Sequence, residues 1–159
     1  MRSRFVRFLV VGFVTGIALL SLSLGVLIQK GDVKAVPPAH ADGSIDPVGQ
    51  WNLTVTFTAT GAQQPSTLKF GKNGSLVNYT PGPGTGTWWM TSSNQFQYTF
   101  TEKILDNQGN QIAYVYVQQQ ATLSADGTTY TASGQGTVHA MDGTVLAVNQ
   151  TTTQATKVA

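Results

Sequence analysis

The sequence predicts an all-β domain behind a short membrane-targeting segment. From residue 49 onward, apolar and polar side chains alternate with a period of two, which is typical of strands with one buried face. Asn-Gly or Asp-Gly pairs, which favour tight hairpin turns, separate runs at positions 73–74, 126–127 and 142–143. The favoured architecture is an up-and-down antiparallel β-barrel of about eight strands after an N-terminal hydrophobic helix, because closure removes exposed strand edges. A β-sandwich is the alternative.

The first 28 residues have the layout of an export signal or an N-terminal membrane anchor. Three arginines lie within the first seven residues, and residues 8–28 carry no charge. This apolar run is long enough to span a bilayer, and longer than the apolar region of most cleaved signals. Both outcomes therefore stay open, and in either case we expect the C-terminal domain to be translocated and the protein to be extracellular or cell-surface.

Residues 29–48 are expected to form a linker ahead of a β-barrel domain at 49–159. Pro37-Pro38 favours extended geometry, and the residues around it offer no face for a core. Two signal-peptidase sites are candidates, Val33-Lys34-Ala35 and Ala39-His40-Ala41.

The net positive charge of the chain belongs to this leader. After residue 41 the chain has four lysines and six acidic residues, so the domain has a net charge near −2. Nucleic-acid binding, which needs a basic patch, is therefore not expected, and the expected partners are the membrane through residues 1–28 and a small ligand.

The strands are expected in sequence order, joined by short links. In the first run Trp51, Leu53 and Val55 share one face, and threonines with other polar residues take the opposite face. The expected runs are 49–60, 68–70, 75–80, 85–91, 95–105, 111–124, 128–133, 136–141 and 144 onward.

Gly49-Gln50-Trp51, at the start of the first long strand, resembles the Gly-x-Trp opening of lipocalin-type (calycin) barrels. The resemblance implies that the tryptophan closes the narrow end of a barrel whose cavity opens at the opposite end. The C-terminal helix of lipocalins has no counterpart here, nor does their arginine at the end of the last strand. The architecture is also similar to small bacterial barrels of the allene-oxide-cyclase-like type.

Glu102 is the candidate catalytic residue. It follows Phe96, Tyr98 and Phe100 on the aromatic face of its strand, and a carboxylate on an inward face must be paired, hydrogen-bonded or protonated. It is interpreted either as a polar anchor or general acid/base in a cavity, or as a solvated residue at the strand end. A pair between Glu102 and His139 is conceivable.

Aromatic residues supply the candidate ligand-binding positions. If the tyrosine face of the strand at 111–124 is interior, it lines a semi-polar cavity; if it is exterior, its tyrosines are ordinary cross-strand aromatics. Adjacent Trp88 and Trp89 are expected on opposite faces. The candidate ligand-binding residues are Tyr98, Phe100, Tyr114, Tyr116, Gln118 and Trp88.

No metal site or cofactor is expected. The chain has no cysteine, and its acidic residues lack the spacing of a calcium loop. The leading hypothesis is an exported or membrane-anchored barrel that binds an apolar or aromatic small molecule. The alternatives are a cofactor-free cyclase or isomerase that uses the barrel cavity, and a structural or adhesive surface domain.

Overall fold

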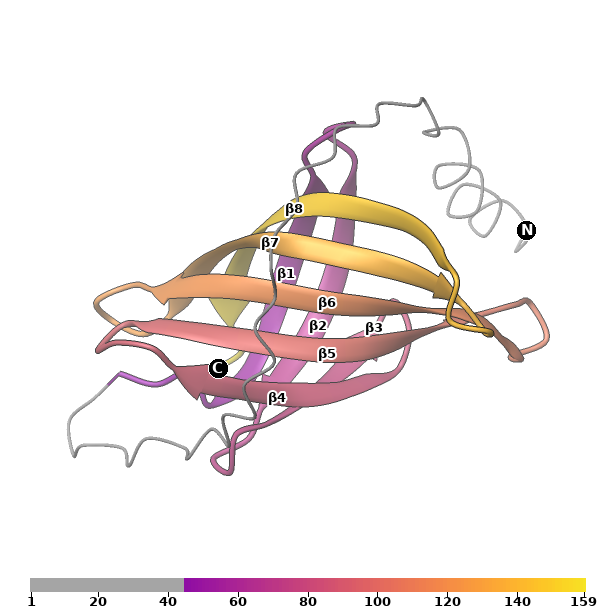
Figure 1. Cartoon of the computed structure of the whole chain (residues 1–159). Coiled ribbons are helices and arrows are strands. Elements are labelled where there is room, and N and C mark those ends of the chain that lie inside the picture. The colour runs from indigo at the N-terminus through magenta and orange to yellow at the C-terminus, as the bar shows by residue number, and fades with distance from the viewer. Residues whose placement is uncertain (1–44) are drawn as a thin grey trace, which may run out of the picture. The chain divides into compact units, whose positions relative to one another are not determined.

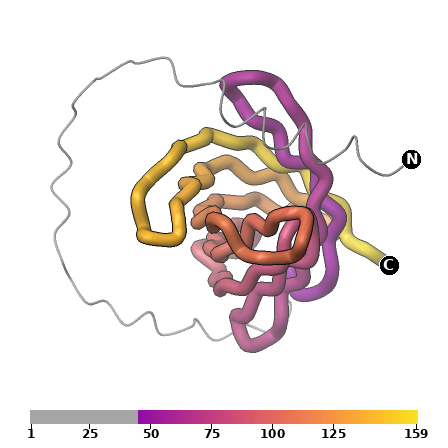
Figure 2. The backbone as a smooth tube through the Cα atoms, turned by 90° about the vertical axis from the view of Figure 1, so that its right-hand side faces the viewer, coloured from indigo at the N-terminus to yellow at the C-terminus, as the bar shows by residue number. Residues whose placement is uncertain are grey.

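The computed structural model describes residues 45–159, which form a closed, eight-stranded antiparallel barrel. The strands are β1 (Gly49–Phe57), β2 (Gln63–Phe70), β3 (Ser75–Thr80), β4 (Gly84–Met90), β5 (Gln95–Leu105), β6 (Gln111–Leu123), β7 (Thr129–Ala140) and β8 (Val145–Lys157). Each strand pairs with the next, and β8 returns to pair with β1. In Figure 1, β1 and β2 run steeply behind β5 to β8. Figure 2 shows the last strand returning to the first.

This architecture confirms the predicted up-and-down barrel and excludes the sandwich. The predicted hydrophobic segment at 1–28 and the linker up to residue 44 lie outside the described residues. Within residues 45–159, no helix is long and apolar enough to cross a membrane.

Two strands differ from the expected runs. The segments expected at 128–133 and 136–141 form one strand, β7, because Gly134 and Gly136 continue its ladder with β6. Strand β2 begins earlier than expected and includes Pro65, which pairs with Thr54 of β1. Pairing of β2 with β3 begins only at Thr67, so the ring of Pro65 interrupts no ladder on that side.

Four hairpins use the same kind of loop. In each, a glycine in the left-handed region, with φ between 67° and 88°, donates its N–H to the carbonyl three residues earlier. Positive φ falls on glycine alone in residues 45–159, as expected where a type I turn is followed by one left-handed residue. The expected Asn-Gly and Asp-Gly turns are confirmed, and the four glycines are Gly74, Gly109, Gly127 and Gly143.

The core is concentrated at one end of the barrel, around Trp51. The Trp51 and Tyr130 rings meet edge to face with centroids 4.9 Å apart, and Phe70 contacts Tyr130 in the same way at 6.2 Å. The Trp51 indole N–H donates to the Pro47 carbonyl at 2.7 Å. Residues 45–48, predicted to be part of the linker, thus belong to the closed end of the barrel, where Pro47 is fully buried.

Candidate functional site

The exposure of the inward side chains changes along β5 and marks an open end of the barrel. Phe96, Tyr98 and Phe100 are buried, with exposures of 0%, 1% and 7%. Glu102 and Ile104, which continue the same inward row, are only half-buried. The interior is therefore packed near Trp51 and reached by solvent beyond Phe100.

Strands β1 and β8 show the same change towards the same end, and β6 shows it in part. On β1, Trp51 and Leu53 are buried, whereas Val55 and Phe57 are half-buried. On β8 the inward residues Asn149 and Ala147 are half-buried, and so are Val117 and Val115 on β6, although Ala113 beyond them is buried. In addition, β1 pairs with β8 only from Thr151 to Lys157, so the first half of β8 extends past its neighbour. The opening opposite Trp51 is the geometry that the lipocalin resemblance implies.

Glu102 lies at this open end with its carboxyl held by the loop between β3 and β4. The Gly82 backbone N–H donates to Glu102 Oε1 at 3.1 Å. Burial raises the pKa of the Glu102 carboxyl to about 7, and the hydrogen bond from Gly82 offsets only part of that effect. Near neutral pH, the carboxyl can thus either donate or accept a hydrogen bond.

A chain of polar groups holds the same loop on the inner wall. Asn78 is fully buried, and its side-chain amide donates to the Gly82 carbonyl at 2.6 Å. The Ser66 hydroxyl donates to the Thr80 carbonyl at 2.7 Å and lies 3.2 Å from Asn78 Oδ1. Hydrogen bonds from Asn78 and Ser66 therefore hold the loop that supports Glu102. The Glu102 carboxyl is bound to this loop and does not extend into solvent.

Gln119 and Thr151 place a second polar group in the interior. Gln119 Nε2 donates to the Thr151 hydroxyl at 2.8 Å, and both side chains are buried. Gln119 Oε1 is buried without a hydrogen-bond partner among the described residues. A buried acceptor of this kind is costly unless a water or ligand satisfies it.

Tyr98, Phe100 and Trp88, which were predicted to bind a ligand, lie inside the barrel, where they pack against other aromatic rings. The Tyr98 and Phe100 rings stack at 6.3 Å. Burial raises the pKa of Tyr98 to about 12, which keeps its hydroxyl protonated. The Trp88 indole N–H donates to the Gly71 carbonyl at 2.8 Å. Of these three, Phe100 is nearest to Glu102 along the inward row.

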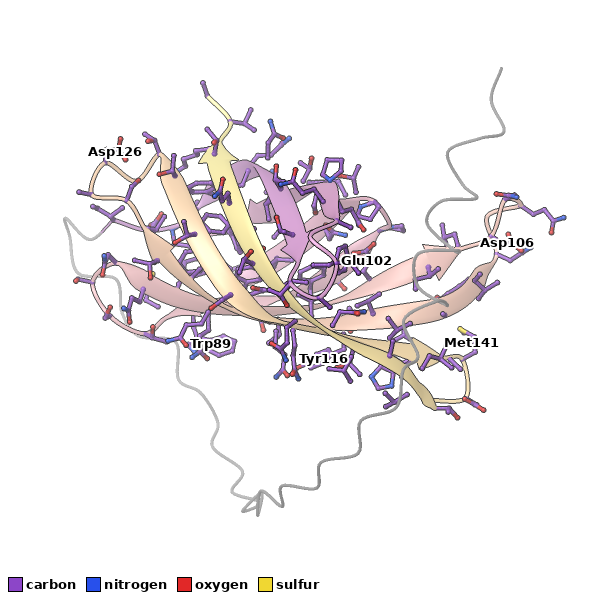
Figure 3. All side chains as sticks on the ribbon, turned by 90° about the horizontal axis from the view of Figure 1, so that it is seen from above. Trp89, Glu102, Asp106, Tyr116, Asp126 and Met141 are labelled. Atoms are coloured by element: carbon purple, nitrogen blue, oxygen red, sulfur yellow. The ribbon has the colours of Figure 1, made fainter. Side chains whose placement is uncertain are left out.

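Of the two alternatives left open for β6, the exterior one holds, and Tyr114, Tyr116 and Gln118 do not line the barrel interior. Because Phe100 pairs with Val117 and Glu102 with Val115, the valines of β6 take the inner face and the tyrosines the outer face. Figure 3 shows Tyr116 projecting from the outside of the sheet. Tyr114 stacks on His139 there, with centroids 4.9 Å apart.

The outward position of His139 also rules out the pair with Glu102, since the two side chains lie on opposite faces of the sheet. The His139 ring nitrogen Nδ1 lies 3.1 Å from the Gly143 carbonyl in the β7–β8 turn. No group of three or more His, Asp or Glu side chains that could hold a metal ion occurs in residues 45–159.

Sequence reasoning missed the other inward polar residues. A signal for two of them was present: Asn78 extends the inward row of Leu76, and Ser66 extends that of Leu68 and Phe70. Gln119 had no such signal, because it follows Gln118 and precedes Gln120, and only the register of β6 shows which of the three faces inward. The missed residues are Ser66, Asn78, Gln119, Thr151 and Thr153.

Neither a protein-family model nor a curated protein sequence matches this chain. Among solved structures, the chain is similar to EF1p2_mFAP2b bound to DFHBI, with a TM-score of 0.51 and 16% sequence identity over 70% of this chain and 93% of that one. It is also similar to a redesigned beta barrel, with a TM-score of 0.46 and 19% identity over 70% of this chain and 91% of that one. The likeness to EF1p2_mFAP2b is one of fold.

Proposed function

We propose that this domain binds a small molecule at the open end of the barrel. The observation that carries the proposal is the change in exposure along the inner wall, from a packed aromatic core at Trp51 to half-buried apolar side chains around Glu102. Small-molecule sites are typically concave and mostly apolar, with a few convergent polar groups. The open end has this composition.

The side chains that line the open end of the barrel indicate the class of ligand. Phe57, Ile104 and Val115 offer apolar contacts, so the body of the ligand is expected to be apolar or aromatic. Glu102 supplies a polar contact, and its carboxyl can pair with either a hydroxyl or a carbonyl of the ligand because its pKa lies near 7.

The fold neighbour supports the proposal, since EF1p2_mFAP2b is bound to DFHBI. The proposal also includes export, with residues 1–28 as a cleaved signal or a retained anchor and the barrel at the cell surface or outside the cell. That part is supported by the basic start and the uncharged run of the sequence alone.

The test is a titration of the full chain with the neutral aromatic dye 1-aminoanthracene, together with mass spectrometry of small molecules extracted from the purified protein. Val115→Trp fills the inner wall at the open end, and Tyr116→Trp adds the same ring at the next position on the outer face. We expect Val115→Trp to weaken dye binding about tenfold or more, about 1.4 kcal/mol, and Tyr116→Trp to leave it unchanged.

Equal effects of the two substitutions would place the dye outside the barrel. Failure of the wild-type chain both to bind the dye and to release an extracted molecule would reject small-molecule binding. A structural or adhesive role would then explain the packed core better.

The pKa of Glu102 favours one second candidate, a cofactor-free cyclase or isomerase in which Glu102 is the general acid/base. A carboxyl with a pKa near 7 is half protonated at neutral pH, which suits proton transfer in either direction. Incubation of the extracted ligand with Glu102→Gln and with the wild type separates the two functions. Conversion by the wild type alone indicates catalysis, and recovery of unchanged ligand from both indicates a carrier.

A further inference from the structure

The outer surface of the barrel carries a second, separate concavity. It is an open groove of about 440 Å³ over the outer face of β4 to β8, whereas the Glu102 side chain lies on the opposite, inner face of the sheet. Six side chains define its chemistry: Trp89, Gln97, Gln118, Gln120, Gln135 and Gln150.

Strand register places these side chains in two neighbouring rows across the sheet. In the first row Trp89 pairs with Gln97, and Gln97 pairs with Gln120. In the second row Gln118 pairs with Gln135, and Gln135 pairs with Gln150. Because neighbouring strands lie about 4.8 Å apart, each row offers one polar group roughly every 5 Å along the groove. Figure 3 shows Trp89 at the outer side of the sheet.

The groove contains no charged side chain, and most of the residues that line it carry an amide or a hydroxyl group. A glutamine amide is both a donor and an acceptor, and the side-chain hydrogen bond within the groove is a weak one from Gln150 Nε2 to Gln135 Oε1 at 3.3 Å. The amides of Gln97, Gln118 and Gln120 have no side-chain hydrogen bond within the described part of the chain, so they can serve a ligand. Trp89 is half-buried, which leaves part of its indole at the surface.

These properties fit one class of ligand. Sugar hydroxyls are donors and acceptors at once, like amides, and the apolar face of a pyranose ring stacks on an indole. A ligand with negative charges, such as nucleic acid or an acidic polysaccharide, finds no cation in the groove. An apolar ligand would leave the amides unpaired, which is unfavourable.

We propose that the groove formed by Trp89 and the glutamines of β5 to β8 binds a neutral oligosaccharide. Trp89 stacks on one sugar ring, and the two amide rows bind hydroxyls of the neighbouring sugars. This site is independent of the ligand proposed for the barrel interior.

The experiment is calorimetric titration of the full chain, kept in a detergent without a sugar headgroup. The panel consists of cellohexaose, laminarihexaose, maltohexaose, xylohexaose and chitohexaose, with oligogalacturonate as an acidic comparator. We expect saturable binding of at least one neutral member and weaker or no binding of oligogalacturonate. Binding of none of the five, or of the acidic member alone, would overturn the proposal.

Variants locate the site. We expect Trp89→Ala and Gln118→Ala each to weaken binding about fivefold or more. Tyr79→Ala removes an exposed aromatic ring on β3, outside the groove, and is expected to bind like the wild type. Wild-type affinity in both groove variants, or an equal loss in Tyr79→Ala, would also overturn the proposal.

Tryptophan fluorescence provides a readout that does not depend on stability. The chain has three tryptophans, and Trp51 and Trp88 are buried, so an emission change on sugar binding should come from Trp89. Trp89→Phe keeps an aromatic ring for stacking and should bind sugar without the emission change. Persistence of that change in Trp89→Phe would place the sugar elsewhere.

Discussion

Gly82 donates its backbone N–H to Glu102 Oε1 at 3.1 Å, and this bond joins the β3–β4 loop to the inner wall of the barrel. The same loop is also held by the buried Asn78 side chain, whose amide donates to the Gly82 carbonyl at 2.6 Å. Glu102 is therefore both a component of the open end and part of the structure that supports it. Its substitution should be judged on stability as well as on binding.

Glu102→Gln is expected to remove a pH dependence of stability. The pKa of Glu102 is raised from 4.5 to about 7 in the folded state, so the folded protein retains a proton that the unfolded chain releases. The free energy of unfolding of the wild type should thus fall as pH rises between those two values.

Glutamine keeps the oxygen that accepts from Gly82 and carries no charge. At pH 8 the variant should be more stable than the wild type by about 1–3 kcal/mol, after allowance for partial solvent access. Urea unfolding at pH 4 and pH 8 measures the effect. An identical pH slope in the two proteins would show that the carboxyl is not desolvated.

Gly134→Ala is expected to destabilise the barrel far more than Gly136→Ala. A Cβ on Gly134 would lie 2.0 Å from the Gln118 carbonyl oxygen and 2.9 Å from the Gln119 Cα, so the backbone of β6 would have to move. A Cβ on Gly136, two residues along the same strand, meets only a side-chain methyl of Val115, at 3.3 Å, and no backbone atom within 4 Å.

We expect a loss of about 2 kcal/mol or more for Gly134→Ala and less than about 1 kcal/mol for Gly136→Ala. Thermal unfolding of the two variants side by side measures the difference. Similar melting temperatures would mean that β6 and β7 are not in such close contact at Gly134.

The buried pair of Gln119 and Thr151 should show strong coupling. Gln119→Met alone removes the donor to the Thr151 hydroxyl and is expected to cost about 1–2 kcal/mol, as is Thr151→Val alone. The double substitution removes both groups, including the unpartnered Gln119 Oε1, and should be nearly neutral. A double-mutant cycle in denaturant gives the coupling energy, and additive losses would contradict the expected pairing.

Trp51→Ala is expected to cost about 3–5 kcal/mol, because it removes the largest ring of the closed end and its hydrogen bond to the Pro47 carbonyl. Trp89→Ala is the control, since its half-buried ring lies on the outer face and should contribute far less. Guanidinium unfolding followed by circular dichroism compares the two. A comparable loss in both variants would mean that Trp51 does not close the core.

The sequence by itself determined the fold class, the order of the strands and the position of most turns. Alternation of apolar residues from Trp51 onward requires strands with one buried face, and glycine is needed where φ is positive, as at Gly127 and Gly143. The inward position of Glu102 also followed from this alternation, since Phe96, Tyr98 and Phe100 precede it on the same face.

Only the tertiary structure decided which face of β6 is interior. Its two faces carry valines and tyrosines of similar apolar character, so periodicity cannot separate them, whereas pairing of Val117 with Phe100 does so at once. Strand pairing also places Gln119 within hydrogen-bonding distance of Thr151. It aligns the glutamines of the outer groove with Trp89. These contacts join residues far apart in the chain, and their partners are set by strand register, which no local pattern encodes.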